Sequence, residues 1–236
     1  MHSEKISVII GARAGSQRVK NKNTRLLNGK PLIVYTIEQA IALTKISDIF
    51  VSSNDPGVKE ICSDFDEVTF IQRPDRISTH VSKDIEYINH ILENFSFDIF
   101  VKLNPTSPFR EVDFIEKNIE KFISNDKYDS ARAVELCKEH PGKMWTIDDG
   151  GFLRSLDLNL KFNYEMHEAQ YQDLPNVYIQ TSSLEIANVK KIRKYGNRSG
   201  KTIMPILCEG VNSFSIDYEF EFFMAEKYLS GELNLS

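Results

Sequence analysis

The first 136 residues alternate between short apolar runs and segments that carry apolar residues at helical spacing. The apolar runs are rich in β-branched and aromatic residues, which is typical of strands buried inside a sheet. This order predicts an α/β fold with a Rossmann-like, mostly parallel sheet and helices on its faces. The expected strands are 5–12, 47–53, 66–73, 97–105 and 128–136, and the expected helices are 30–44, 55–65, 82–95 and 111–124.

The pattern changes after residue 137. Residues 138–175 contain Asp-Asp and Gly-Gly pairs, then many aromatic and amide residues without a clean period, which predicts an excursion from the sheet, such as a hairpin arm. Strand signals return at 183–189 and 201–207. Residues 217–229 are expected to form a closing helix, which packs through Phe220, Phe223, Met224 and Leu229.

Length and charge limit the class of protein. A chain of 236 residues suits one domain or one domain with an appendage, and the net charge of −5 argues against a protein that binds nucleic acid through its overall charge. The three cysteines are odd in number and form no C-x-x-C, so we expect thiols in a reducing compartment. Because no signal peptide and no membrane-length apolar run is apparent, the expected location is the cytoplasm, with no membrane partner.

A basic loop follows the first expected strand in the stretch VIIGARAGSQRVKNKN, residues 8–23. The loop combines small residues (Ala12, Ala14, Gly15 and Ser16) with the cationic side chains of Arg13, Arg18 and Lys22. Backbone N–H groups and cations arranged in this way can hold phosphates. The loop also lies at the carboxyl end of a strand, where ligands bind in open α/β sheets. The structural alternative is a solvated surface loop.

Two familiar phosphate-binding patterns do not match this loop. The P-loop pattern G-x-x-x-x-G-K-[ST] needs glycine five positions after Gly11, where Ser16 stands. The dinucleotide pattern G-x-G-x-x-G needs glycine at the position of Arg13. Any phosphate site in the loop is therefore of another type.

A series of motifs along the chain resembles one enzyme family. The motifs are ARAGSQRVKNKN (12–23), GKPLI (29–33), VSSND (51–55), QRPDRIS (72–78), LNPTSPFR (103–110), EHPGKMW (139–145), DLPNVY (173–178) and SIDYEFEFFMAE (215–226). In this order they closely resemble the acylneuraminate cytidylyltransferases, the CMP-sialic acid synthetases. The resemblance covers nearly the whole chain.

The resemblance implies a single nucleotidyltransferase domain over 1–236 with the fold of nucleotide-diphospho-sugar transferases. Such an enzyme transfers CMP from CTP to a sialic-acid-like 2-keto sugar acid and releases pyrophosphate. The implied catalytic residues are Lys22, Arg13 and Asp217. The implied nucleotide-binding residues are Ala12, Arg13, Gly15, Ser16, Arg18, Lys22, Asn23, Arg73 and Asn104, and the implied acceptor-binding residues are Asn104, Thr106, Ser107, Gln172 and Thr181.

The resemblance also implies a bound Mg²⁺ (or Mn²⁺). The family holds the metal through two aspartates of a D-I-D motif. Asp217 matches the second aspartate, whereas Ser215 stands at the first position. A water, another carboxylate or weaker catalysis could accompany that loss of charge. The structural alternative for Asp217 is a cap at the start of the closing helix.

The acceptor side departs further from the family. Thr181, Ser182 and Glu185 stand where the family often has Asn, Gly and Tyr, and Tyr171 and Ile179 replace basic residues. An Arg is the best bidentate partner for a carboxylate, so the acceptor is expected to be a different nonulosonic acid or one held without that contact.

By the same resemblance, residues 138–180 form an inserted arm that serves dimerisation and the acceptor site, which implies a homodimer. Two other functions stay open. One is the same fold acting on a different acceptor, such as a phosphorylated one. The other is a degenerate homologue that binds nucleotide without turnover, which Ser215 suggests.

Overall fold

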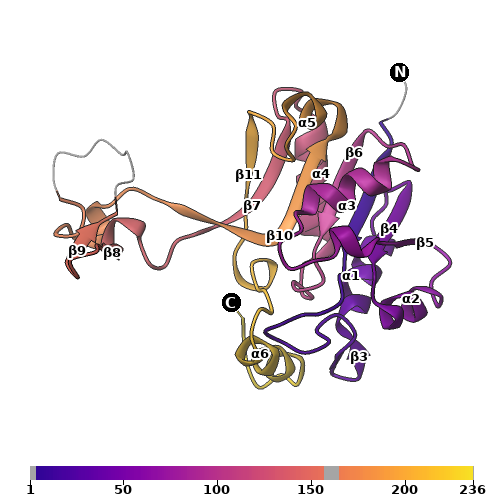
Figure 1. Ribbon diagram of the computed structural model, residues 1–236, viewed down its shortest axis with the longest axis horizontal. Coiled ribbons are helices and arrows are strands. Elements are labelled where there is room, and N and C mark those ends of the chain that lie inside the picture. Colours follow the sequence, from indigo (N-terminus) through magenta and orange to yellow (C-terminus); the bar gives the residue numbers. More distant parts are fainter. Residues whose placement is uncertain (1–3, 157–164, 236) are drawn as a thin grey trace.

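The computed structural model describes residues 4–156 and 165–235 (Figure 1). Its centre is a seven-stranded sheet of order β11-β7-β10-β6-β1-β4-β5. The pairs that join β1, β4, β5 and β6, and the pair of β7 with β11, are parallel, whereas β10 is antiparallel to both neighbours. The strands are β1 (Ile6–Gly11), β4 (Asp48–Ser53), β5 (Val68–Gln72), β6 (Ile99–Leu103), β7 (Ser130–Leu136), β10 (Tyr178–Asn188) and β11 (Ile203–Leu207). The expected α/β fold with a mostly parallel sheet is confirmed.

Helices cover both faces of the sheet (Figure 1). One face packs mainly against α1 (Leu32–Ile41), α2 (Pro56–Cys62) and α4 (Val112–Ile123), and the other packs against α3 (Asp84–Leu92) and α5 (Val189–Tyr195). Alternate strand residues point to opposite faces, so Ile6, Val8 and Ile10 of β1 belong to the first core, whereas Ile9 belongs to the second. None of the helices in the described ranges is long and apolar enough to cross a membrane.

Helix α5, which follows β10 directly, was not among the expected helices. Asn188 caps it by accepting a hydrogen bond from the backbone N–H of Lys191 at 3.1 Å, and Gly196 ends it in the left-handed region at φ 65°. These are ordinary helix boundary signals. The helix has only one and a half to two turns, and its lysines and arginine obscure the apolar period.

The expected packing of the closing helix was confirmed for Leu229 and was wrong for Phe220 and Phe223, while Met224 is half-buried. Helix α6 spans Glu219–Leu229, and Phe220 and Phe223 are 66% and 53% exposed, whereas Phe222 is 1% exposed. Phe222 and Ala225 are buried and Leu229 is partly buried against Val19 and Leu27. These three residues have the i, i+3, i+7 spacing of one helical stripe. The run of aromatic residues fits more than one stripe, and contacts with the basic loop decide between them.

An arm leaves the body between β7 and β10 (Figure 1). It includes a short hairpin of β8 (Trp145–Ile147) and β9 (Leu153–Ser155), and it returns through a β10 that begins at Tyr178 rather than near 183. The pairing of β10 with β7 is irregular between Gln180 and Glu185. The expected excursion from the sheet is therefore present. A second small pair, β2 (Leu26–Leu27) and β3 (Lys30–Pro31), follows the basic loop.

Candidate active-site cleft

A cleft of about 520 Å³ opens at the carboxyl ends of β1 and β6. The basic loop forms one side, and the segment after β6, the bulged part of β10 and the residues before α6 form the rest. The lining residues are Gly11, Arg13, Ser16, Gln17, Arg18, Val19, Lys22, Asn23, His80, Asn104, Pro105, Thr106, Ser182 and Asp217. Parallel strands carry their ligands at this edge, so the position agrees with the expectation for the loop.

Residues at the end of β4 hold the basic loop in place. The amide of Ala12 donates to Ser52 O at 3.0 Å, and the amide of Ala14 donates to Asn54 Oδ1 at 2.9 Å. Gly15 has a φ of 76°, a left-handed conformation that glycine adopts readily. The Arg13, Arg18 and Lys22 side chains of the loop line the cleft and supply cationic groups that can bind phosphate.

Lys22 joins the basic loop to the residues before α6. Its Nζ donates to Ile216 O at 2.9 Å and lies 3.5 Å from Asp217 Oδ1. The side chain is only 14% exposed. Burial lowers the pKa of the Lys22 ammonium, and the nearby Asp217 carboxylate partly offsets this effect. The cation is therefore held in the cleft by one carbonyl and one carboxylate.

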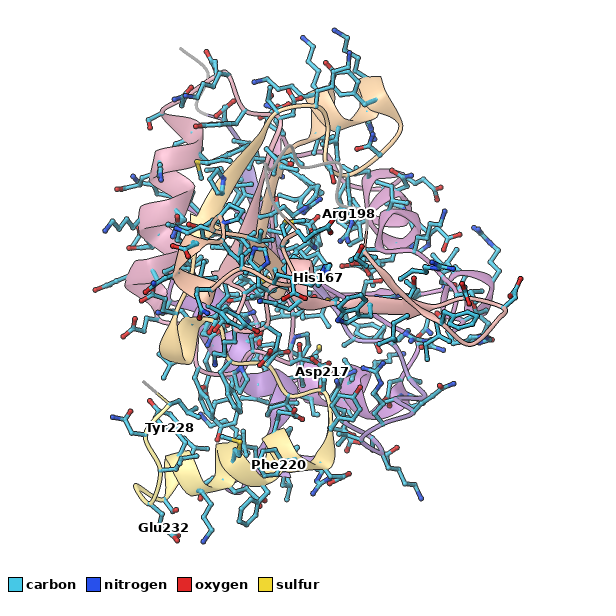
Figure 2. The ribbon with its side chains drawn as sticks, turned by 90° about the vertical axis from the view of Figure 1, so that its left-hand side faces the viewer. His167, Arg198, Asp217, Phe220, Tyr228 and Glu232 are labelled. Atoms are coloured by element: carbon cyan, nitrogen blue, oxygen red, sulfur yellow. The ribbon has the colours of Figure 1, made fainter. Side chains whose placement is uncertain are left out.

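Asp217 lies between the sheet and the start of α6 (Figure 2). Its Oδ2 accepts a hydrogen bond from Ser215 Oγ at 3.2 Å, and the amide of Ile216 donates to Thr106 O at 2.7 Å. Tyr218, not Asp217, occupies the N-cap position of α6, so the capping alternative was wrong. Asp217 instead contributes the one carboxylate among the lining residues in the described part of the chain.

Several residues expected in the site do not line the cleft, namely Ala12, Gly15, Arg73, Ser107, Gln172 and Thr181. Ala12 and Ser107 are buried, Gly15 lies in the turn of the basic loop, and Thr181 pairs with Cys208 Sγ at 3.5 Å. Gln172 lies in the turn Tyr171–Asp173 of the arm. The structure thus brings together Arg13, Ser16, Arg18, Lys22, Asn23, Asn104, Thr106 and Asp217.

Arg73 lies behind the floor of the cleft. Its Nε donates to Ser52 Oγ at 3.0 Å, its Nη2 donates to Ser52 O at 2.8 Å, and its guanidinium stacks on Tyr87 at 4.2 Å. A Cβ on Gly11 would come within 3.1 Å of Arg73 Nη2 and 2.8 Å of Tyr87 Cζ. Gly11 therefore permits this close packing, and Arg73 shapes the floor from below.

Three polar residues of the cleft, Gln17, His80 and Ser182, were not among the residues expected in the site. His80 follows the QRPDRIS motif, and Ser182 lies where the pairing of β10 with β7 is irregular. A serine in a strand gives no signal of its own, and an irregularity in strand pairing depends on partners that are distant in the sequence.

Five charged residues form one ion cluster, in which Lys102, Arg132 and Glu185 are buried, whereas Asp84 and Arg198 are partly exposed. Glu185 pairs across β10 with Lys102 of β6 on one side and with Arg132 of β7 on the other. Asp84 Oδ2 lies 2.8 Å from Lys102 Nζ and 2.7 Å from Arg198 Nη1, which also lies 2.8 Å from Glu185 Oε2. Arg198 can be located in Figure 2, well away from Asp217. Glu185, which stands at the tyrosine position of the resembled motif, is thus committed to this ion cluster.

A family model described as "Cytidylyltransferase" matches residues 7–199. The chain belongs to this cytidylyltransferase family. Residues 7–199 contain all of β1 but its first residue, the strands β2 to β10 and the basic loop, so the family match covers most of the cleft. The resemblance found in the motifs is confirmed.

Individual relatives of this chain agree with the family match. An N-acylneuraminate cytidylyltransferase of Escherichia coli O18:K1:H7 is 27% identical over 94% of this chain and 51% of its own length. A CMP-N,N'-diacetyllegionaminic acid synthase of Legionella pneumophila is 29% identical over 98% of this chain and 97% of its own length. The chain thus spans about half of the first relative and nearly all of the second.

A solved structure of a CMP:2-keto-3-deoxy-manno-octonic acid synthetase, complexed with CTP, has the same fold. It superimposes with a TM-score of 0.69 at 14% identity and covers 97% of this chain and 100% of its own. The nucleotidyltransferase fold expected from the motifs is therefore confirmed.

Proposed function

We propose that this cytidylyltransferase transfers CMP from CTP to a sialic-acid-like 2-keto sugar acid and releases pyrophosphate. The observation that carries the proposal is the cleft in which Arg13, Arg18 and Lys22 face Asp217. The names of the relatives support it, since they include N-acylneuraminate, legionaminic acid and pseudaminic acid cytidylyltransferases or synthases.

In this reaction an oxygen of the sugar attacks the α-phosphorus of CTP. A new oxygen–phosphorus bond forms, the bond to the β-phosphate breaks, pyrophosphate leaves and the sugar hydroxyl loses its proton. The protein contributes by positioning the reactants and neutralising phosphate charge. Lys22, held by Ile216 O at 2.9 Å, is suited to the α-phosphate and leaving group, while Arg13 and Arg18 are suited to the remaining phosphate oxygens.

The oxygen atoms of Asp217 and Ser215 also fit a divalent cation, Mg²⁺ (or Mn²⁺), that takes its other ligands from elsewhere. Mg²⁺ is commonly held by one or two carboxylates together with waters and substrate phosphates. Asp217 offers one carboxylate beside the Ser215 hydroxyl, and the described residues contain no group of three His, Cys, Asp or Glu suited to hold a metal alone. We therefore propose a metal held by Asp217 and by the nucleotide itself. When bound, it would neutralise phosphate charge.

The acceptor is proposed as a nonulosonic acid rather than sialic acid itself. Asn104, Thr106 and Ser182 line the cleft, and we propose that they form its acceptor side. Tyr171 and Ile179, which replace basic residues of the resembled motifs, are both exposed on the arm. The carboxylate of the acceptor would then need a partner other than an arginine at these two positions.

Calorimetric titration with CTP, UTP, GTP and ATP, each with and without Mg²⁺, tests the nucleotide half of the proposal. We expect CTP to bind at least about tenfold more tightly than the other three, a difference of about 1.4 kcal/mol. We also expect Mg²⁺ to strengthen CTP binding. A preference for another nucleotide would overturn the cytidylyl assignment, and no binding at all would favour a degenerate homologue. Pyrophosphate release with nonulosonic acids and with sugar phosphates then separates the two acceptor classes.

We further propose that the arm mediates a homodimer. Trp145 and Ile147 of β8, Leu153 of β9 and Phe152 beside it are all exposed. A two-stranded hairpin with apolar side chains in water is marginally stable at best, so packing against a second copy would stabilise it.

Light scattering of the full chain and of a charged variant checks this proposal. We expect twice the chain mass of 27.1 kDa for the wild type and the chain mass for Ile147→Glu at micromolar concentration. Val81→Glu is the matched control, because Val81 and Ile147 are each 73% exposed but Val81 lies on the body. A monomeric wild type, or equal loss of dimer in both variants, would contradict a dimer built by the arm.

A further inference from the structure

Arg110 ends the segment after β6 that supplies Asn104, Pro105 and Thr106 to the cleft. It is only 3% exposed, and it does not line the cleft itself. All five N–H donors of its guanidinium are used. Nε donates to Gln39 Oε1 (3.2 Å), Nη1 donates to Asn104 O (3.0 Å) and Ser183 O (2.6 Å), and Nη2 donates to Thr36 Oγ1 (3.0 Å) and Gln39 Oε1 (3.0 Å).

Every one of these acceptors is a neutral oxygen. Burial of a cation without a carboxylate partner is costly, and here it lowers the pKa of Arg110 to about 9. The group is still charged at neutral pH. A buried cation that pairs with no carboxylate in the described chain is a poor device for stability alone, so its fork of hydrogen bonds needs another explanation.

The carbonyls that Arg110 holds belong to Asn104, which lines the cleft, and to Ser183, which follows the lining residue Ser182. Asn104 O also receives hydrogen bonds from Ser107 N at 3.2 Å and Thr36 Oγ1 at 3.4 Å, so the backbone of this lining residue is fixed from several directions. Ser183 O follows Ser182, which enters the cleft from the irregular part of β10. One guanidinium therefore ties the end of β6 to the bulge of β10.

The same segment reaches the phosphate side of the cleft. Thr106 O accepts the amide of Ile216 at 2.7 Å, and Ile216 O accepts Lys22 Nζ at 2.9 Å. The hydrogen-bonded path thus runs from Arg110 through Asn104 and Thr106 to Ile216 and Lys22. A displacement of the segment would move the acceptor side and Lys22 relative to each other.

We propose that Arg110 is a positioning residue for the cytidylyl transfer, which sets Asn104 and Ser182 at a fixed distance from Lys22 and Asp217. The inference rests on the proposed function. Lysine is a poor substitute because its ammonium carries a single nitrogen with three donors and cannot form the planar fork. The geometry explains why an uncompensated charge is kept at this position.

Arg110→Lys is the main test, because it keeps the charge and removes the fork. We expect saturated turnover to fall about 10²-fold, the effect of a misplacement of about 1 Å, while CTP affinity changes by less than about threefold. Thr36→Val, which removes one acceptor of the fork and one donor to Asn104 O, should lower turnover in the same direction by a smaller factor. Thr36→Val keeps the proposal testable if Arg110→Lys does not fold.

Arg132→Lys is the matched control, because Arg132 is another buried arginine. Its hydrogen bonds and ion pair go to Arg198, Ser199 and Glu185, none of which lines the cleft. We expect it to lower the melting temperature as much as Arg110→Lys does while turnover stays within about threefold of wild type. Turnover of Arg110→Lys within threefold of wild type, or an equal loss in Arg132→Lys, would overturn the positioning role. A wild type that binds CTP but releases no pyrophosphate would overturn the proposed function first, and the positioning role with it.

Discussion

Replacing Lys22 with methionine is expected to lower turnover by about 10² to 10³-fold while the protein stays folded. Lys22 Nζ is the cation that the structure fixes most firmly in the cleft, through Ile216 O at 2.9 Å and Asp217 Oδ1 at 3.5 Å. Removal of a preorganised charge that faces developing phosphate charge has an effect of this size. Pyrophosphate release at saturating CTP and acceptor measures it, and circular dichroism reports the fold.

Lys22→Arg and Lys20→Met are the controls for this variant. Burial lowers the pKa of Lys22 below the ordinary value of 10.5, so activity should decline as the pH rises through that lowered pKa, because the charged form is lost. Lys22→Arg should retain measurable turnover and resist that alkaline decline. Lys20, a neighbouring lysine that does not line the cleft, should tolerate methionine with little change. Unchanged turnover of Lys22→Met would remove Lys22 from the mechanism.

Replacing Glu185 with glutamine is expected to lower the free energy of unfolding by about 3–5 kcal/mol. The Glu185 side chain is 7% exposed and serves Lys102, Arg132 and Arg198 at once. Without its charge, three cations would share Asp84 as their remaining carboxylate in the cluster. Urea unfolding followed by fluorescence measures the change, and the effect is large because an uncompensated buried charge is left behind.

Glu38→Gln is the comparison for this effect. Glu38 Oε2 lies 2.6 Å from Lys30 Nζ, but both side chains are well exposed. Glu38→Gln should therefore lower the free energy of unfolding by less than about 1 kcal/mol. If Glu185→Gln lowers the free energy of unfolding no more than Glu38→Gln does, the ion cluster on β6, β7 and β10 does not stabilise the sheet.

The elements with strong local signals were predictable from the sequence. The β-branched run at Ile6–Gly11 and the Asp55-Pro56 pair, whose carboxylate accepts the Gly57 amide at 2.9 Å, need little information from elsewhere in the chain. The basic loop was also located correctly, because an order of strand then loop in an α/β sheet fixes the edge at which the loop lies.

The features that were predicted wrongly, or not at all, depend on distant partners. The phase of α6 is decided by Val19 and Leu27, about 200 residues earlier in the chain. The position of Arg73 behind Gly11 depends on Tyr87, and the fork of Arg110 depends on Ser183 in an irregular part of β10. Motifs identified these residue types but carried no information about which face each side chain would take. The metal, the homodimer and the cytoplasmic location stay predictions.

The hydrogen bond from Lys22 to Ile216 spans 194 residues of sequence, and the ion pair of Arg25 with Glu219 spans another 194. Contacts of such high sequence separation form late in folding, because the chain entropy of closing the loop must first be overcome. The central sheet is complete by Leu207, whereas the cleft needs Ile216, Asp217 and α6. During synthesis, therefore, a chain can bury its sheet before the cleft is complete. Binding of nucleotide would then indicate that the last step of folding has taken place. If nucleotide is added during refolding, it should accelerate only the docking of α6 and leave the rates of the earlier steps unchanged.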